Sequence, residues 1–186
     1  MGQVTLANKI SIVRIILIPF FIMAVAYSRL DLALIVFIVA IISDGADGFI
    51  ARALKQQTQL GTILDPIADK LLLISAYICL SMVESIPQHL RLPPYVPIIV
   101  ISRDVIIVIG SIMIYVVKGD IKISPSLVGK ITTFFQMITI VCILVKFDHS
   151  RSVWNATIVL TIISGLDYVM KGSKLLSENN TFKKAG

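Results

Sequence analysis

The fold of this chain is decided by residues 44–69, which contain the segments DGADGFIAR (44–52) and GTILDPIAD (61–69). These segments hold four aspartates, although the surrounding sequence is largely apolar: Asp44, Asp47, Asp65 and Asp69. An ionised carboxylate in an apolar surrounding costs several kcal/mol unless it is paired or bound to a metal. The stretch therefore predicts a functional site built from buried carboxylates.

The composition indicates a chain that lies mostly in a membrane. Hydrophobic residues make up 56% of its 186 residues and charged residues only 15%, whereas a soluble domain has about 25% charged residues. A membrane-spanning helix needs roughly 17–25 apolar residues. Six runs meet this requirement: 7–27, 31–53, 62–84, 95–117, 127–146 and 152–172. We therefore predict one all-α polytopic membrane domain over residues 1–186, with six transmembrane helices.

The distribution of lysine and arginine predicts the orientation, because cytoplasmic loops collect positive charge. With a cytoplasmic N-terminus, nine of these residues fall on the cytoplasmic side and four on the other side. We therefore expect both termini and the active site to face the cytoplasm of a bacterial inner membrane; a mitochondrial inner membrane is the alternative. The net charge of +6 then reflects these loops, and we expect no nucleic-acid partner. The first run also resembles a signal peptide that ends at Ala24-Val25-Ala26, but we expect it to be retained as a span.

The spacing of the aspartates predicts a metal site. Asp44 and Asp47 are three residues apart and Asp65 and Asp69 are four apart, so each pair lies on one helix face. The two helices are expected to be antiparallel neighbours, which would bring both pairs to a similar depth. Four carboxylates so close together would repel one another, and hard divalent cations that prefer oxygen ligands, such as Mg²⁺, Mn²⁺ or Ca²⁺, would remove that repulsion. A site with two metal ions suits in-line displacement at phosphorus.

These segments resemble the signature of the CDP-alcohol phosphatidyltransferases, D-x2-D-G-x2-A-R-x8-G-x3-D-x3-D, at all eight fixed positions. The resemblance implies six helices in a homodimer and the transfer of a phosphatidyl group from CDP-diacylglycerol to an alcohol, with release of CMP. It also implies that Asp44, Asp47 and Asp65 bind two Mg²⁺ or Mn²⁺ ions. Asp69 would be the general base and share in metal binding. The residues implied to contact the nucleotide are Asn8, Asp44, Gly48, Ala51, Arg52 and Gly61.

Two further segments bear on the acceptor alcohol. Residues 101–104 (ISRD) and 129–136 (GKITTFFQ) resemble motifs of phosphatidylglycerophosphate synthases, although Thr132 stands where those enzymes commonly have lysine. Together with residues 5–8 (TLAN), the same segments also resemble cardiolipin synthases of the mitochondrial type. We therefore predict glycerol 3-phosphate as the acceptor; phosphatidylglycerol is the alternative, and other alcohols of the family remain open.

The remaining charges inside apolar runs are candidates for binding a phosphate of the acceptor: Arg14, Arg103 and Lys130. For Arg14 and Arg103 a structural role is the alternative. Arg103 could simply pair with Asp104, and Arg14 could extend to the membrane interface. We expect Lys70 to pair with the acidic cluster or a lipid phosphate, and Asp167 to pair with Lys171 four residues later. A cation transporter would also bury carboxylates, but the paired repeats typical of transporters are not visible.

Overall fold

The computed structural model describes residues 6–54, 59–84, 86–88, 90–118 and 127–182, with side chains described for residues 12–43, 70–110 except 85 and 89, and 127–173. This part of the chain is entirely helical apart from turns and short connections. The helices are α1 (Leu6–Ala26), α2 (Leu30–Leu54), α3 (Gln59–Met82), α4 (Tyr95–Lys118), α5 (Leu127–Leu144) and α6 (Ser150–Phe182). The prediction of six helices is confirmed. The main difference is that α6 continues to residue 182, well beyond the predicted end at 172.

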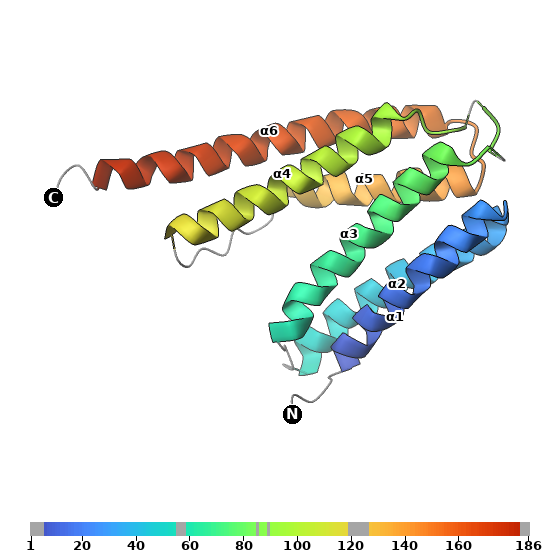
Figure 1. Ribbon diagram of the computed structural model, residues 1–186, viewed down its shortest axis with the longest axis horizontal. Helices are drawn as coiled ribbons and strands as arrows, with labels where there is room; N and C mark the ends of the chain where they lie inside the picture. The colour runs from blue at the N-terminus through green and yellow to red at the C-terminus, as the bar shows by residue number, and fades with distance from the viewer. Residues whose placement is uncertain (1–5, 55–58, 85, 89, 119–126, 183–186) are drawn as a thin grey trace.

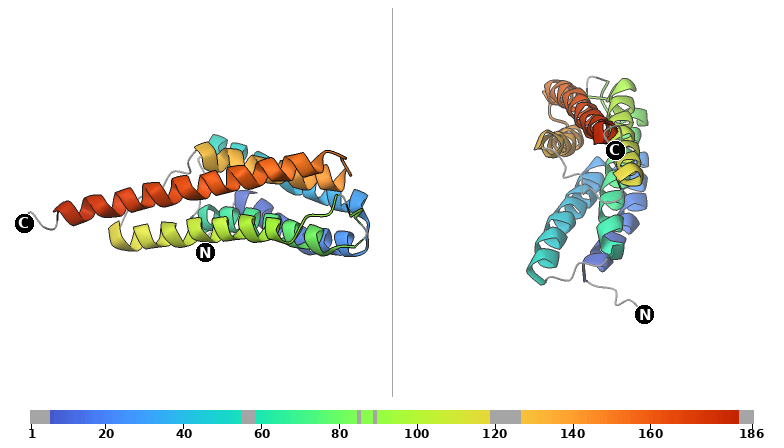
Figure 2. Two further views of the ribbon diagram at one scale, coloured as in Figure 1. Left: turned by 90° about the horizontal axis from the view of Figure 1, so that it is seen from above. Right: turned by 90° about the vertical axis from the view of Figure 1, so that its left-hand side faces the viewer.

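The helices form two groups of three that meet at one end of the molecule (Figure 1). In the first group α1 packs along both α2 and α3, and in the second α6 packs along both α4 and α5. Contacts of α3 with α4 and α5, and of α2 with α5, join the groups. The α1–α2, α3–α4 and α5–α6 connections lie together at the right of Figure 1, and the helices diverge from there toward the ends that carry the termini (Figures 1 and 2).

Each helix of the first group has one buried stripe. On α1 the stripe consists of Arg14, Ile18, Phe21 and Val25, and on α2 of Leu30, Ala33, Phe37 and Ala40. Steps of three and four residues keep these positions on one helix face, toward the neighbouring helices. The rings of Phe21 and Phe37 lie 5.8 Å apart and join the two stripes.

Large apolar side chains also cover much of the outer surface. Examples from five of the six helices are Phe20, Ile42, Ile78, Phe134 and Leu166, each more than a third exposed. A soluble protein rarely exposes so many large apolar residues together. Residues 127–144 of α5 and 150–173 of α6 are long and apolar enough to cross a membrane, and they are the two helices that meet this criterion among the residues described.

Threonine hydroxyls connect α5 with α6. The Thr139 and Thr157 hydroxyls lie 2.8 Å apart, and Thr157 also donates to the carbonyl oxygen of Phe135 at 3.2 Å. Nearer the start of α5, Thr132 donates to the carbonyl oxygen of Leu160 at 3.2 Å. In lipid the hydrophobic effect does not drive helices together, so interhelical hydrogen bonds of this kind contribute to their association.

Two connections at the end where the helices meet use the same turn. Ser28 and Lys146 have positive φ angles of 60° and 59°. In each turn one N–H bonds five residues back, from Arg29 to Ala24 at 2.8 Å and from Phe147 to Cys142 at 2.8 Å. This is the Schellman motif, in which the left-handed position is usually glycine because a side chain there is strained.

We predict that Ser28→Gly raises the stability of the protein by about 1 kcal/mol, because glycine removes the strain of the left-handed conformation. The measurement is the midpoint of thermal unfolding in detergent. Ser102→Gly is the control, because Ser102 is exposed within α4 and glycine in a helix interior lowers stability. Equal shifts for both variants would contradict the assignment of the turn.

Candidate active site

The four aspartates lie on α2 and α3, two antiparallel helices that both pack against α1. Asp44 and Asp47 fall in the second half of α2, and Asp65 and Asp69 in the first half of α3. Both pairs therefore lie on continuous helices, toward the end of the molecule where the helices diverge (Figure 1). Their side chains are outside the described part of the chain, as are those of the predicted nucleotide contacts Asn8, Gly48, Ala51, Arg52 and Gly61.

The helical register relates these positions to the buried stripes. On α2 the buried positions 30, 33, 37 and 40 are spaced by three and four residues, and the same spacing continues to 44 and 47. On α3 the buried positions 73, 76 and 80 extend backward by the same steps to 69 and 65. The backbone thus places all four aspartate positions in register with the packed faces of their helices.

Arg14 lies on the buried face of α1, which packs against α2 and α3. The side chain is only 1% exposed, which makes Arg14 the largest fully buried side chain described. Arg14 shares the buried stripe of α1 with Ile18 and Phe21, so its side chain lies inside the bundle. The alternative, in which Arg14 extends to the membrane interface, is therefore wrong. A guanidinium so deeply buried requires nearby acceptors or negative charge.

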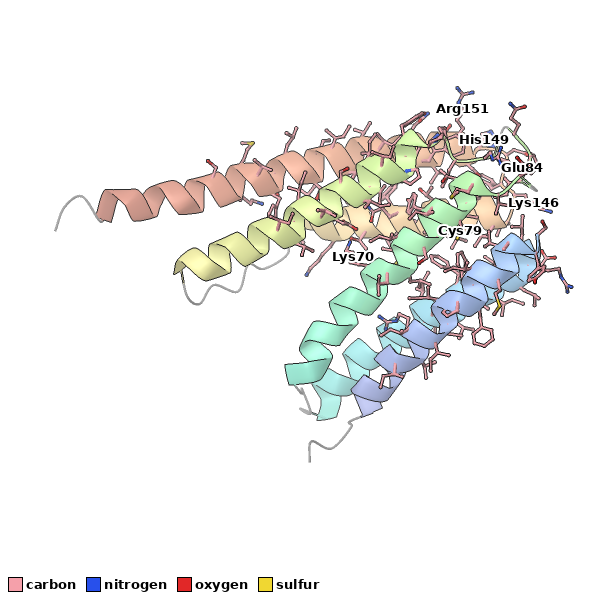
Figure 3. All side chains as sticks on the ribbon, in the orientation of Figure 1. Lys70, Cys79, Glu84, Lys146, His149 and Arg151 are labelled. Atoms are coloured by element: carbon pink, nitrogen blue, oxygen red, sulfur yellow. The ribbon has the colours of Figure 1, made fainter. Side chains whose placement is uncertain are left out.

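A chain of polar contacts begins one residue after Asp69 and connects three helices. Lys70 of α3 donates to Asp104 Oδ2 of α4 at 2.8 Å, and Arg103 donates to Asp104 Oδ1 at 2.8 Å. Arg103 also donates to the Ser164 hydroxyl of α6 at 2.5 Å. Asp104 is 4% exposed and Arg103 is 7% exposed, so both charges are shielded from solvent. Figure 3 shows Lys70 on α3 at the level where α3 and α4 begin to diverge.

Among the described residues, these contacts leave one positive charge without a counterion. Lys70 and Arg103 carry two positive charges, and Asp104 supplies one negative charge between them. The Arg103 Nε atom is also buried without a hydrogen-bond partner among the described residues. Among the described residues, one donor and one net positive charge therefore remain in this cluster, which suits an anionic ligand.

The predicted phosphate contacts occupy different environments. Arg14 and Arg103 are buried, whereas Lys130 is exposed near the start of α5 and forms no hydrogen bond or ion pair with the residues described. The structural alternative for Arg103, a pair with Asp104, is present in the structure. The predicted pairing of Asp167 with Lys171 is confirmed, at 2.8 Å.

The link from Lys70 to Asp104 is the main feature that the sequence reasoning missed. The sequence predicts that Lys70 pairs with the acidic cluster or with lipid phosphate, and it offers Asp104 only as a possible partner of Arg103. The register of α3 could have indicated that Lys70 faces a neighbouring helix. Lys70 lies seven residues before the fully buried Tyr77 and is therefore on the same helix face. No group of three or more metal-binding side chains lies among the described residues, which exclude all four predicted ligands.

Comparison with known proteins gives the family. The family model of the CDP-alcohol phosphatidyltransferases matches residues 4–166, which include both aspartate pairs and the Lys70–Asp104–Arg103 contacts. The chain belongs to this family. As a phosphatidyltransferase it is an enzyme, and the resemblance seen in residues 44–69 is confirmed.

Several relatives are similar to this chain over most of its length. A CDP-diacylglycerol–glycerol-3-phosphate 3-phosphatidyltransferase of Aquifex aeolicus is 30% identical over 91% of this chain and 96% of its own length. The enzyme of the same name from Bacillus subtilis is 30% identical over 94% of this chain and 98% of its own length. A human cardiolipin synthase (CMP-forming) is 29% identical over 91% of this chain and 62% of its own length.

We predict that Asp104→Ala destabilises the phosphatidyltransferase by about 3–5 kcal/mol, because it leaves the buried Arg103 charge without its counterion. Lys171→Ala is the matched control. It breaks an ion pair of the same length in which Lys171 is 62% exposed, and its expected cost is below about 1 kcal/mol. Unfolding in detergent would be followed by helical circular dichroism. Similar losses for the two variants would show that the Asp104 contacts do not support the fold.

Proposed function

We propose that this phosphatidyltransferase transfers the phosphatidyl group of CDP-diacylglycerol to glycerol 3-phosphate and releases CMP. The observation that supports an acceptor with its own phosphate is the pairing of two cations, Lys70 and Arg103, with the single carboxylate of Asp104, directly after Asp69. An acceptor that bears its own phosphate would supply the missing negative charge. Glycerol 3-phosphate and phosphatidylglycerol both carry a phosphate, and the names of the relatives from Aquifex aeolicus and Bacillus subtilis favour glycerol 3-phosphate.

In this proposal Asp44, Asp47 and Asp65, together with Asp69, hold two Mg²⁺ or Mn²⁺ ions. Carboxylate oxygens are suitable ligands for these ions, and the register of α2 and α3 is compatible with a shared site. Bound ions would neutralise the pyrophosphate of CDP-diacylglycerol and make CMP a better leaving group. Asn8, Gly48, Ala51, Arg52 and Gly61 are the proposed contacts of the nucleotide.

Asp69 acts as the general base. The acceptor hydroxyl oxygen attacks the phosphorus that carries the diacylglycerol, the bond from that phosphorus to CMP breaks, and CMP leaves with the electron pair. The hydroxyl proton passes to Asp69, which must lie within about 3 Å of the attacking oxygen. Nearby cations lower the basicity of a carboxylate, so the proton is transferred only as the new bond to phosphorus forms.

Arg14, Arg103 and Lys130 are the proposed contacts of the acceptor phosphate. Arginine matches phosphate geometry through paired N–H donors, and the Arg103 Nε remains available. The exposure of Lys130 suits a residue that first attracts the anion, and the buried arginines suit residues that fix its position.

The proposal includes the membrane topology. All six helices cross the membrane, with both termini and the active site on the cytoplasmic side of a bacterial inner membrane, and the enzyme is a homodimer. The exposed apolar residues on the outer faces of the helices support membrane burial beyond α5 and α6. The excess of lysine and arginine on one side supports the orientation.

Cardiolipin synthesis, with phosphatidylglycerol as the acceptor, is the second candidate. It is favoured by the similarity to the human cardiolipin synthase and by Thr132, which stands where phosphatidylglycerophosphate synthases commonly have lysine. Thr132 is fully buried and donates to carbonyl oxygens of Val128 and Leu160, so here it serves the α5–α6 interface.

The test is release of CMP by the purified enzyme from CDP-diacylglycerol with Mg²⁺ and either glycerol 3-phosphate or phosphatidylglycerol. We expect release with glycerol 3-phosphate and a loss of at least about a hundredfold in Asp69→Asn, the range of general-base catalysis. Release with phosphatidylglycerol alone would replace the proposed acceptor. Metal flux without any transfer would instead favour a transporter.

We predict that Lys130→Gln raises the KM for glycerol 3-phosphate about tenfold, because one charge-assisted contact to phosphate is lost. The KM for CDP-diacylglycerol and kcat should change little, since the nucleotide and the reacting atoms are bound elsewhere. Lys146→Gln is the control, because Lys146 is also exposed but lies in the α5–α6 turn at the other end of α5 (Figure 3). An unchanged KM for glycerol 3-phosphate in Lys130→Gln would remove Lys130 from the acceptor site.

A further inference from the structure

A groove runs between α1 and α2 near the turn that connects them. Its volume is about 590 Å³, within the roughly 300–1,000 Å³ typical of small-molecule sites. Apolar side chains of both helices form its body: Phe20, Met23, Leu32 and Val36. Phe20, Met23 and Leu32 are each about half exposed, so the groove opens to the outside of the bundle and not to its interior.

The mouth of the groove is polar. Tyr27 and Arg29, which belong to the α1–α2 connection, line it, and both are exposed. The Arg29 guanidinium forms no hydrogen bond or ion pair with the residues that the structure describes. Asp31 is nearby in the first turn of α2 but does not pair with it. The Tyr27 hydroxyl and the Arg29 guanidinium thus lie at the end of an apolar groove. This arrangement matches the boundary between the acyl chains and the head groups of phospholipids.

This groove is separate from the proposed active site. Val36, its lining residue nearest to the aspartates in sequence, precedes Asp44 by eight residues, or about 12 Å along α2. Arg29 belongs to the α1–α2 connection and lies farther away, because this connection is at the end of the molecule where the helices meet (Figure 1). A ligand with its charged group at Arg29 therefore does not occupy the site of phosphatidyl transfer.

We propose that the α1–α2 groove binds one anionic phospholipid, with an acyl chain along Phe20, Met23, Leu32 and Val36 and its phosphate on Arg29. The guanidinium can donate two parallel hydrogen bonds to a phosphate. Tyr27 is placed to reach the ester region. The inference rests on the proposed burial of α1 and α2 in the membrane, but not on the identity of the acceptor alcohol.

Charge argues for a lipid and against a second copy of the chain. In a two-fold symmetric contact the same patch meets itself, so the groove would face the groove of the other subunit. Where the two-fold axis passes beside the groove, the Arg29 side chains of the two copies would approach each other, and their like charges would repel. An anionic head group instead neutralises the charge, and an acyl chain covers the apolar body of the groove.

The test is a lipid titration of the purified full-length enzyme in neutral detergent, followed by native mass spectrometry without substrates. The probe lipids are dioleoyl phosphatidylglycerol and dioleoyl phosphatidylcholine. We expect Arg29→Gln to weaken binding of one phosphatidylglycerol about tenfold or more and to leave phosphatidylcholine unaffected. Arg151→Gln is the control, because Arg151 is an exposed arginine at the same end of the molecule that does not line the groove (Figure 3).

Two further variants make the test specific. Asp31→Asn should strengthen binding of phosphatidylglycerol, because it removes a negative charge near Arg29. Leu32→Trp should fill the groove and weaken binding of both lipids, while CMP release shows that the variant is folded. Equal affinity of Arg29→Gln and Arg151→Gln for phosphatidylglycerol would overturn the proposal. A change in the ratio of monomer to dimer in Leu32→Trp, with lipid binding intact, would overturn it in favour of a contact between copies.

Discussion

The cost of holding an ionised side chain inside an apolar helix bundle is the constraint that organises this protein. Asp104 shows how it is met, because both oxygens of its buried carboxylate accept hydrogen bonds from cations, one from Lys70 and one from Arg103. The same cost applies to the four aspartates of α2 and α3, whose positions continue the packed faces of their helices. In the proposed mechanism metal ions balance the aspartates and the anionic acceptor balances the cations, so the substrate would complete the electrostatics of the bundle.

The two ends of the molecule differ in structure and in proposed role. At one end the helices meet in short turns, two of which are closed by left-handed residues. This end holds the core in place, and the groove beside Arg29 belongs to it. Toward the other end the two groups of helices diverge; the aspartate positions lie in that half of the first group, and Lys70, which contacts Asp104, lies near the middle of α3 (Figures 1 and 3). The packed end can thus support a site that, in the proposed function, admits both a lipid and a polar acceptor.

The sequence predicted the number and type of the helices well, because long apolar runs separated by charged turns leave few alternatives. It also predicted the family, because the signature in the segments that hold the aspartates is highly specific. It could not predict how each helix is rotated about its axis. For this reason the burial of Arg14 and the contact between Lys70 and Asp104 came only from the structure. Both depend on packing between helices that are distant in sequence, which a local pattern does not encode.

The most direct test of the central claim measures metal binding itself. Titration of the purified enzyme with Mn²⁺ in the presence of CMP, followed by electron paramagnetic resonance, counts the bound ions without relying on turnover. Two ions per chain are predicted for the natural sequence, and Asp44→Asn and Asp65→Asn should each weaken their binding strongly. Unchanged Mn²⁺ binding in a variant with all four aspartates replaced by asparagine would contradict the claim that these carboxylates hold the catalytic metals.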